Sequence, residues 1–270
     1  MPLTLTRTRS ILEGINHHPV KKLGQNFLID GNIVKKSLDY AAVTPKDNIV
    51  EIGPGLGTLS QGLLDNGATV YAIEKDLLLA TYLQKTLVSK FAKKFVLSVG
   101  DALDSPVAGL DTSTCKNFKI VANLPYAIST SWMELVLRNN LPDSLVLMLQ
   151  KETADRFMAK PHTKAYGPIS IFLQSAYTQI QAHTVSKGCF YPVPKIDSTL
   201  LYLKRNKQPF LFDLEQKGLI RHWFSQRRKQ LKGLVAHSER GKKWLIACQN
   251  SGLGTTARSE EVPLSLWQNL

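Results

Sequence analysis

The alternation of apolar runs with helix-length segments constrains the fold of this 270-residue chain more than any other feature. The first five apolar runs lie at residues 48–53, 69–76, 95–102, 119–126 and 144–151. Three segments with helical patterns lie between them, at residues 58–67, 77–91 and 129–140. Parallel strands need crossover connections, which are usually helices. This order therefore predicts a mainly parallel, doubly wound α/β sheet.

Two later runs complete the predicted sheet, and a different pattern follows them. The runs at 177–185 and 198–205 have no helix between them, which predicts a hairpin-like, partly antiparallel edge and a total of seven strands. Beyond about Arg205 the chain is helical, basic and punctuated by glycine, at 211–237, 241–250 and 263–270. We therefore expect a Rossmann-like domain at 1–205 and a small all-helical domain at 206–270.

The composition is that of a soluble globular protein, with 43% hydrophobic and 20% charged residues. No apolar run approaches the length that spans a bilayer, and the first ten residues lack the apolar region of a secretory signal. Cys115, Cys189 and Cys248 lie far apart without a C-x-x-C motif. We expect a cytoplasmic protein with reduced core cysteines, no metal and no membrane partner.

The basic residues are concentrated near the two ends of the chain, whose net charge is +13. Residues 1–36 carry net +4 and residues 201–245 net +9, whereas residues 37–200 carry only +1. This distribution favours a nearly neutral enzyme core flanked by nucleic-acid-binding surfaces. The densest cluster is predicted within about one and a half helical turns, and consists of Arg227, Arg228, Lys229 and Lys232. A solvated helix face is the alternative interpretation of this cluster.

A glycine-rich loop follows the first predicted strand in "EIGPGLGTLS". Gly53, Gly55 and Gly57 would allow the backbone to turn tightly and approach a ligand. The dinucleotide fingerprint requires Gly or Ala where this chain has Thr58, which disfavours a nicotinamide or flavin site. Taken alone, the loop could equally be a structural turn between strand and helix.

Four consecutive strands end in a residue of a type that binds ligands. Glu74 lies 21 residues after Gly53 and could accept both hydroxyls of a ribose, and Asp101 could accept from the exocyclic amine of an adenine. The fourth strand ends in Asn123. Each acid alone could be a solvated turn residue. Carboxyl ends of parallel strands share one sheet edge, so we interpret the series as one site. Ribose and adenine contacts without a diphosphate signature favour S-adenosylmethionine.

Eight stretches carry a resemblance to a known family: "KKLGQNFLID", "EIGPGLG", "GDAL", "ANLPYAIST", "LMLQKETADR", "KAYGPIS", "FYPVPKIDS" and "SQRRKQLKG". In this order they resemble the small-subunit ribosomal RNA adenine dimethyltransferases, the KsgA family, over about residues 19–270. Erm-type large-subunit rRNA methyltransferases share most of the cofactor half. The "FYPVPKIDS" and "QRRK" motifs and the helical tail favour the small-subunit branch.

The resemblance implies a class I methyltransferase fold and a set of site residues. It implies that an arm within residues 1–36 covers the cofactor, with Asn26 and Leu28 as contacts. The remaining implied cofactor residues are the glycine loop, Glu74, Asp101 and Asn123. Phe190 matches a second aromatic that closes the base pocket, although it could be a core aromatic instead. Residues 1–18 have no clear counterpart in the family.

The implied activity is dimethylation of N6 on two adjacent adenosines in a 3′-terminal hairpin loop of small-subunit (16S) rRNA, a step of ribosome biogenesis. The implied partner is the small ribosomal subunit or its precursor, and we expect a monomer. Two other functions stay open at this point: an Erm-type enzyme, and a non-catalytic ribosome-assembly factor. Intact Glu74, Asp101 and Asn123 argue against the latter, because a site without catalysis need not keep the sequence Asn-Leu-Pro-Tyr.

The Asn123-Leu124-Pro125-Tyr126 sequence suits chemistry on an adenine amine. The N6 lone pair is delocalised into the ring, so methyl transfer requires the nitrogen to become tetrahedral. The side-chain oxygen of Asn123 and the backbone carbonyl of Leu124 could accept its two N–H groups. Pro125 restrains Leu124 to an extended conformation. Tyr126 offers a face on which the base can stack.

Overall fold

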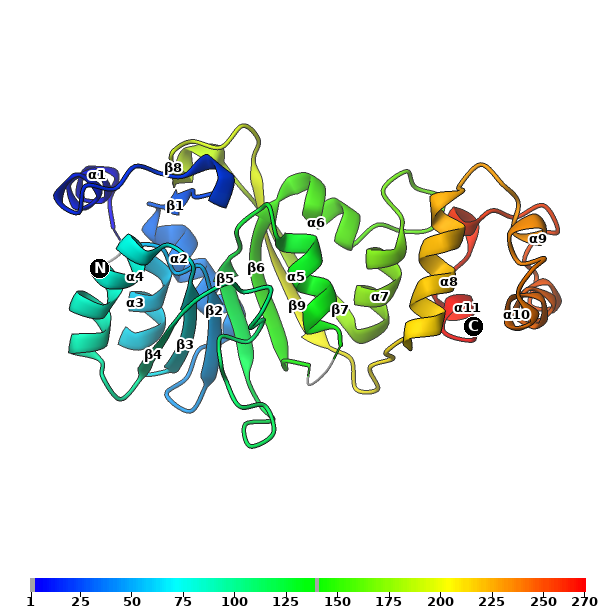
Figure 1. Cartoon of the computed structure of the whole chain (residues 1–270), viewed down its shortest axis with the longest axis horizontal. Helices are drawn as coiled ribbons and strands as arrows, with labels where there is room; N and C mark the ends of the chain where they lie inside the picture. Colours follow the sequence, from blue (N-terminus) through cyan, green and yellow to red (C-terminus); the bar gives the residue numbers. More distant parts are fainter. Residues whose placement is uncertain (1–2, 139–140) are drawn as a thin grey trace. The chain divides into compact units, whose positions relative to one another are not determined.

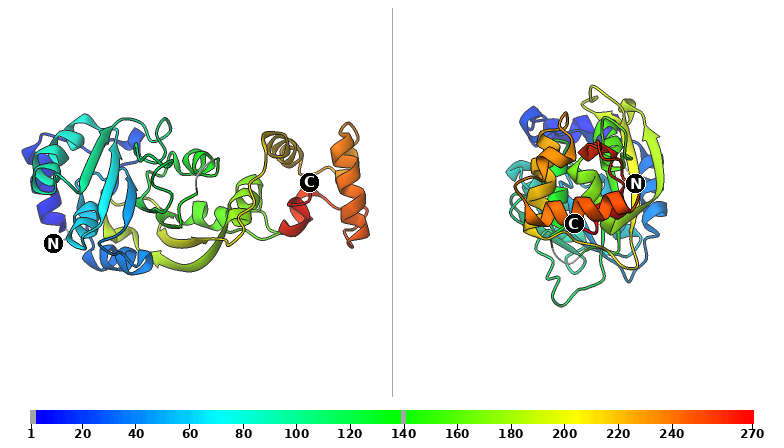
Figure 2. Two further views of the ribbon diagram at one scale, coloured as in Figure 1. Left: turned by 90° about the horizontal axis from the view of Figure 1, so that it is seen from below. Right: turned by 90° about the vertical axis from the view of Figure 1, so that its right-hand side faces the viewer.

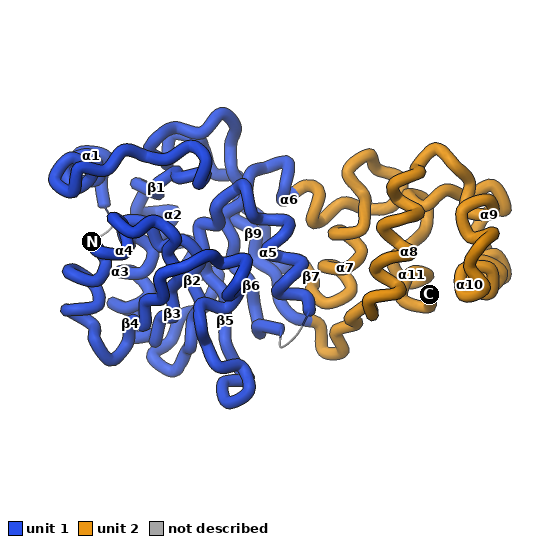
Figure 3. Tube along the Cα trace, in the orientation of Figure 1, with its two compact units in different colours: residues 1–154, 179–205 blue, residues 155–178, 206–270 orange. Residues whose placement is uncertain are grey.

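The computed structural model describes residues 3–138 and 141–270, and the chain separates into two compact units (Figures 1 and 3). The first unit, a sheet with its flanking helices, contains residues 1–154 and 179–205. The second, helical unit contains residues 155–178 and 206–270. The helical unit therefore begins earlier than the single boundary at 205 that we expected. The cause is helix α7 (Pro168–Ala176), which packs on helix α8 (Leu214–Ser225).

The seven-stranded sheet confirms the predicted fold class. Its strand order is β4-β3-β2-β5-β6-β9-β7, with parallel pairing from β4 through β6 and antiparallel pairing between β6 and β9. The strands are β2 (Asn48–Ile52), β3 (Thr69–Glu74), β4 (Phe95–Val99), β5 (Lys119–Asn123), β6 (Ser144–Gln150), β7 (Tyr177–Val185) and β9 (Ser198–Arg205). The runs at 177–185 and 198–205 are neighbours in the sheet, as expected.

The crossover helices also lie where the sequence pattern placed them, although several are shorter. They are α3 (Thr58–Asp65), α4 (Leu77–Leu83) with its π-helical extension (Gln84–Val88), and α5 (Ser129–Val136). The predicted helix at 129–140 includes residues 139–140, which lie outside the described residues. The pattern missed α7 and also helices α1 (Leu5–Gly14), α2 (Gly31–Ala41) and α6 (Lys151–Phe157).

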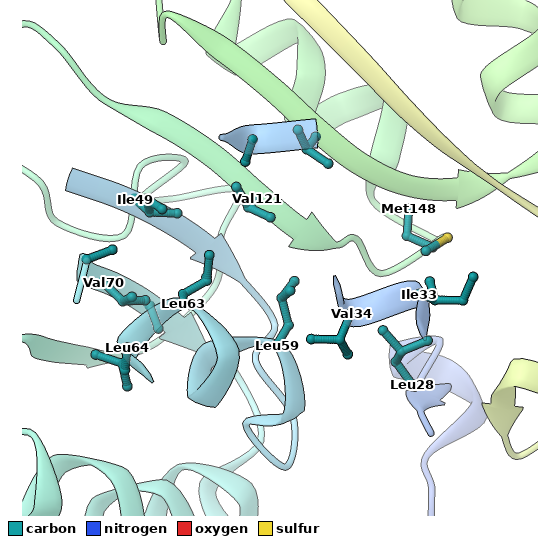
Figure 4. Packing of buried hydrophobic residues seen from close by; sticks show 14 of the residues in the cluster. Leu28, Ile33, Val34, Ile49, Leu59, Leu63, Leu64, Val70, Val121 and Met148 are labelled. Atoms are coloured by element: carbon teal, nitrogen blue, oxygen red, sulfur yellow. The ribbon is translucent and has the colours of Figure 1, made fainter. Parts of the chain in front are cut away.

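One side of the core is formed by α2, α3 and α4 packed on alternate residues of the strands (Figure 4). Ile49, Val70 and Val121 come from three neighbouring strands, Leu63 of α3 lies beside them, and Val34 of α2 belongs to the same cluster near Leu59. All five side chains are at most 2% exposed. Successive strand residues point to opposite faces, so every second residue is available to pack on these helices. This packing fixes the strand ends that carry the site.

An N-terminal arm crosses the outside of the sheet unit. It comprises α1 (Leu5–Gly14), a 3-10 turn (Lys21–Leu23) and β1 (Phe27–Leu28), which pairs antiparallel with β8 (Phe190–Tyr191) beyond a second 3-10 turn (Lys187–Cys189). Leu12 of α1 belongs to one apolar cluster with Leu79 of α4, and Figure 2 shows the blue N-terminal helix beside the segment that carries α4.

The helical unit is held together by stacked aromatic rings. Trp223 of α8 stacks on Trp244 of α10 (Glu239–Asn250) with centroids 5.3 Å apart, and Trp244 stacks on Trp267 at 4.8 Å. Trp267 belongs to α11 (Leu264–Trp267); the unit also contains α9 (Leu231–Leu234) and a 3-10 turn (Ser259–Glu261). The stretch 211–237 that we predicted as helical is broken, because residues 226–229 form a turn and Gln230 pairs with Arg258 in a β-bridge.

The structure also bears on the predicted burial of the cysteines and on the absence of a membrane-spanning segment. Cys248 is buried as expected, but Cys115 and Cys189 are partly exposed, so the prediction of three core cysteines is wrong for those two. Among the described residues, no helix combines the length and the apolar character needed to cross a membrane.

Candidate cofactor and base-binding site

A pocket lies at the carboxyl ends of β2, β3, β4 and β5, where the strand order reverses between β2 and β5. Ligands of open α/β sheets bind at such a reversal. Its lining comes from the arm, the glycine loop and the segments after three strands: 22–28, 51–56, 58–59, 73–75, 79, 100–102 and 123–128. The structure therefore brings together Asn26, Leu28, Glu74, Asp101 and Asn123 as the sequence predicted.

The glycine loop packs directly against the Asn-Leu-Pro-Tyr segment. Gly53 has φ +64°, and a Cβ atom there would lie 3.0 Å from Cγ of Pro125. A side chain at this position would separate the two loops. Gly57 has a different role and does not line the pocket: a Cβ there would lie 2.6 Å from Leu87 and 2.9 Å from Leu83. The structure therefore does not place Gly57 in contact with the cofactor pocket. Its lack of a side chain instead allows close packing against α4 and its π-helical extension.

Glu74 ends β3 and is held by two backbone amides. Its Oε2 accepts from the N–H of Gly55 at 3.0 Å and its Oε1 accepts from the N–H of Asp76 at 2.9 Å. The residue is 6% exposed, and burial raises its pKa above the usual value despite these hydrogen bonds. The carboxylate keeps lone pairs beyond the two it uses here, so it can accept hydroxyl groups from a ligand in the pocket.

Asp101 lies at the same sheet edge and is engaged by its neighbours. Its Oδ2 lies 2.7 Å from Nζ of Lys75, and its Oδ1 accepts from the N–H of Leu103 at 2.9 Å. The hydrogen bond from Lys75 lowers the pKa of Asp101. Lys75 itself lines the pocket, a role that the sequence patterns did not assign. A ligand amine that approaches Asp101 would share its carboxylate with Lys75.

The amide of Asn123 is oriented by the arm. Its Nδ2 donates to the backbone carbonyl of Asn26 at 2.9 Å. The assignment of the nitrogen follows from this bond, since a carbonyl oxygen can only accept. One of the two N–H groups of the amide is therefore bound by protein, which fixes the orientation of the amide, and Oδ1 is the atom of the amide that can accept from a ligand. A base whose amine lies in the pocket would meet an acceptor.

The residues after Asn123 are anchored one by one. The N–H of Leu124 donates to the carbonyl of Met148 at 3.2 Å, and the carbonyl of Pro125 accepts from the N–H of Ile128 at 3.2 Å. Tyr126 and Ser198 share a hydrogen bond of 2.6 Å between their hydroxyls. Burial raises the pKa of Tyr126, so its hydroxyl stays protonated at neutral pH. The phenol ring is thus held at its edge while it lines the pocket.

Phe190 is not where the family resemblance implied. It is 1% exposed and packs in the core cluster with Leu28 and Val34. It does not line the pocket, so the structure corrects its assignment to the pocket wall and favours the core interpretation. The cause is its pairing with Leu28 across β8 and β1, which turns the ring into the core.

Glu51 is a pocket residue that the sequence analysis missed. It lies in the middle of apolar β2, is 2% exposed, and accepts from the hydroxyl of Ser60 at 2.6 Å. Burial raises its pKa to about 8, and the charge of Glu74 adds to the effect. The signal that could have found it is a single acid inside the apolar run "NIVEIG", because an unpaired charge is seldom buried without a reason.

The four basic residues of the predicted RNA contact divide into two kinds. Arg228, Lys229 and Lys232 are exposed. Arg227 is instead tied into the helical unit: its Nη1 donates to the carbonyl of Lys164 at 2.7 Å, and its Nε lies 3.5 Å from Oε2 of Glu260. Arg227 therefore makes contacts within the helical unit, next to the three exposed basic residues. In the described part of the chain, no group of His, Cys, Asp and Glu residues could hold a metal ion.

Comparison with known proteins identifies relatives for nearly the whole chain. Residues 16–262 match the family described as "Ribosomal RNA adenine dimethylase". The Ribosomal RNA small subunit methyltransferase A of Opitutus terrae is 49% identical over all of this chain and 98% of its own length. The protein of the same name from Listeria innocua is 39% identical, over 83% of this chain and 78% of its own.

Two solved structures share the fold at lower identity. A dimethyladenosine transferase from Plasmodium falciparum aligns with a TM-score of 0.71 and 23% identity over 90% of this chain and 95% of its own. The 23S rRNA methyltransferase ErmE aligns with a TM-score of 0.67 and 21% identity over 90% and 97%. These two comparisons support the architecture of the sheet and its flanking helices.

The raised pKa of Glu51 predicts a pH dependence of stability. Between the usual Glu pKa of 4.5 and about 8, the folded protein holds a proton that the unfolded chain has released. The free energy of unfolding contributed by Glu51 is therefore full below pH 4.5 and declines as the pH rises through this window. Glu51→Gln can still accept the Ser60 hydroxyl but cannot ionise. Urea unfolding of both proteins at the two ends of the window should show a smaller decline for Glu51→Gln, and an equal decline would contradict the assignment.

Proposed function

The chain belongs to the ribosomal RNA adenine dimethylase family, and from this premise we propose that it dimethylates N6 of two adjacent adenosines in a 3′-terminal hairpin loop of small-subunit rRNA. The enzyme is an S-adenosylmethionine-dependent rRNA adenine dimethyltransferase. The observation that carries the proposal for the site is the hydrogen bond from Nδ2 of Asn123, a residue that lines the pocket, to the carbonyl of Asn26, because it fixes the amide and leaves Oδ1 to accept from a base.

The pocket fits the cofactor on three counts. Glu74 is a buried acid with spare acceptor capacity for the ribose hydroxyls. Asp101 is an ionised acid at the neighbouring strand end, suited to the adenine amine. The glycine loop has no side chain at Gly53, where a Cβ would meet Pro125 at 3.0 Å. When bound, S-adenosylmethionine supplies an electrophilic methyl group on its sulfonium sulfur.

The residues after β5 would prepare the target adenine for the transfer. Oδ1 of Asn123 and the carbonyl of Leu124 would accept the two N–H groups of N6, which favours the tetrahedral nitrogen and turns its lone pair away from the ring. Tyr126 would hold the base by its face, a contribution of about 1–3 kcal/mol. Positioning of this kind supplies most of the rate in a direct displacement. The protonated product nitrogen is acidic and can lose its proton to water.

The exposed basic cluster of the helical unit, Arg228, Lys229 and Lys232, would contact the phosphates of the RNA. The substrate partner would be the small ribosomal subunit or its precursor, met in the cytoplasm by a monomer of this chain. An Erm-type activity on the large subunit is the competing outcome, and a non-catalytic assembly factor is another. Labelled methyl transfer to small and large subunits distinguishes these two alternatives from the proposed function.

Labelled methyl transfer tests the function directly. Purified enzyme is incubated with S-adenosylmethionine carrying a labelled methyl group and with small or large ribosomal subunits that lack the modification, and the RNA is digested to nucleosides. We expect label in N6,N6-dimethyladenosine from the small subunit only. Label in the large subunit would support the Erm-type alternative. Absence of transfer to both substrates, with S-adenosylhomocysteine still bound, would support the non-catalytic alternative.

A second prediction separates the ring of Tyr126 from its hydroxyl. Tyr126→Ala loses the stacking face, so single-turnover transfer should slow by between about five- and a hundredfold. Tyr126→Phe keeps the face but leaves the hydroxyl of Ser198, a residue that is 0% exposed, without its partner. Adding Ser198→Ala to Tyr126→Phe removes that unpaired group and should restore part of the loss. If Tyr126→Phe is as slow as Tyr126→Ala in both backgrounds, the hydroxyl takes part in the chemistry.

A third prediction concerns RNA binding. Replacing Arg228, Lys229 and Lys232 with Ala should weaken RNA binding and reduce the slope of log K against log salt by about 2, since fewer counterions are released from a single-stranded loop. Arg227 is left intact because it holds the helical unit. The matched control replaces Lys85, Lys90 and Lys93, three exposed lysines of the sheet unit. If the control flattens the slope equally, net charge and not this cluster governs binding.

A further inference from the structure

One carboxylate of the sheet unit binds two side chains of the N-terminal arm. Nε2 of His17 lies 2.8 Å from Oδ2 of Asp76, and Nε2 of Gln25 donates to the same oxygen at 2.9 Å. The side chains of His17 and Asp76 are 2% and 10% exposed. His17 stands between α1 and the 3-10 turn, in the part of the chain to which the family resemblance assigned no role. This buried contact therefore calls for a function of its own.

Asp76 connects the arm to the pocket through its remaining groups. Its Oδ1 accepts from the N–H groups of Leu78 and Leu79 and so caps α4. Its backbone N–H donates to Oε1 of Glu74 at 2.9 Å. Burial alone would raise the pKa of Asp76, but the hydrogen bonds from His17 and Gln25 outweigh it and lower the pKa. The carboxylate is thus ionised, and the fastening is a charge-assisted hydrogen bond in a partly buried place.

The arm that is fastened in this way forms one wall of the pocket. Residues 22–28 line it, and the carbonyl of Asn26 orients Asn123. The ring of Phe27 lies against Gly55, where a Cβ atom would be 3.1 Å away. Leu12 of α1 packs in one cluster with Phe27 and with Leu56 of the glycine loop. Displacement of the arm would therefore open the pocket and release Asn123 together.

We propose that His17 is a positioning residue of the cofactor site: through Asp76 it holds the arm closed over the pocket and sets how quickly the spent cofactor leaves. The inference rests on the proposed function, in which two adenosines each receive two methyl groups. Each transfer leaves S-adenosylhomocysteine, which has to be exchanged before the next. An arm that closes too loosely binds cofactor weakly, and an arm that closes too tightly retains the product.

The test compares three substitutions in the full chain. His17→Phe keeps an aromatic ring but removes the donor, and His17→Gln restores a donor. His18→Phe changes the next residue, whose side chain is exposed, and serves as the matched control. The probe is S-adenosylhomocysteine: its affinity is measured by calorimetry and its dissociation rate by displacement in a stopped-flow instrument. The thermal midpoint and RNA affinity of each variant are measured alongside.

Loss of a hydrogen bond to a charged group shifts the equilibrium between the open and closed arm by about ten- to a hundredfold. The affinity for S-adenosylhomocysteine changes less, because it follows the fraction of protein molecules whose arm is closed. We therefore expect His17→Phe to weaken binding about three- to tenfold and to speed dissociation by about tenfold or more. His17→Gln should recover most of both values, and RNA affinity should not change. If His17→Phe does not fold, Asp76→Asn, which retains an oxygen for the α4 cap, replaces it in the comparison.

Three outcomes would overturn different claims. Wild-type affinity and dissociation rate in His17→Phe, or equal changes in His18→Phe, would overturn the positioning role. Failure of the unmodified protein to bind S-adenosylhomocysteine at all would instead overturn the proposed cofactor site. A uniform loss of cofactor and RNA affinity in His17→Phe that His17→Gln does not recover would show that His17 only supports the fold.

Discussion

The hydrogen bond from the Asn123 amide to the carbonyl of Asn26 is the contact on which the site depends. It joins the end of a central strand to an arm that lies almost a hundred residues away in sequence, and it fixes the orientation of an amide that lines the pocket. The packing of Gly53 against Pro125 and the anchoring of Glu74 by Gly55 hold the surrounding loops in matching positions. The chemistry proposed for adenine follows from this arrangement, because an N–H group of the base needs an acceptor at that point.

Much of the fold could be predicted from the sequence, because its signal is local. Apolar runs between helical patterns located all seven strands of the sheet, and the parallel order places Glu74, Asp101 and Asn123 at one edge. Helices α2 and α7 were missed, and the domain boundary with them. Their apolar residues match neighbours that are distant in sequence, such as Phe212 against Phe172, and no local pattern shows that pairing.

The errors within the site have one physical origin, which is that tertiary contacts determine the role of a side chain. Arg227 and Arg228 are adjacent and chemically equal, yet one is bound by Lys164 and Glu260 and the other is exposed. Phe190 is turned into the core by its pairing across β1 and β8, and Gly57 serves helix packing. The role of His17 could not be predicted for the same reason, since its partner Asp76 lies in another part of the chain.

The central claim is that protein holds the donor end of Asn123 so that its acceptor meets the target amine. Single-turnover methyl transfer at saturating cofactor and saturating small subunits, with wild type, Asn123→Ala and Asn123→Asp, tests it most directly. Aspartate has the same shape and keeps an acceptor, but it cannot donate to Asn26 and would place a carboxylate oxygen against that carbonyl. We therefore expect Asn123→Asp to transfer as slowly as Asn123→Ala, with RNA binding largely retained. Transfer by Asn123→Asp at the wild-type rate would show that the anchoring by Asn26 is not required.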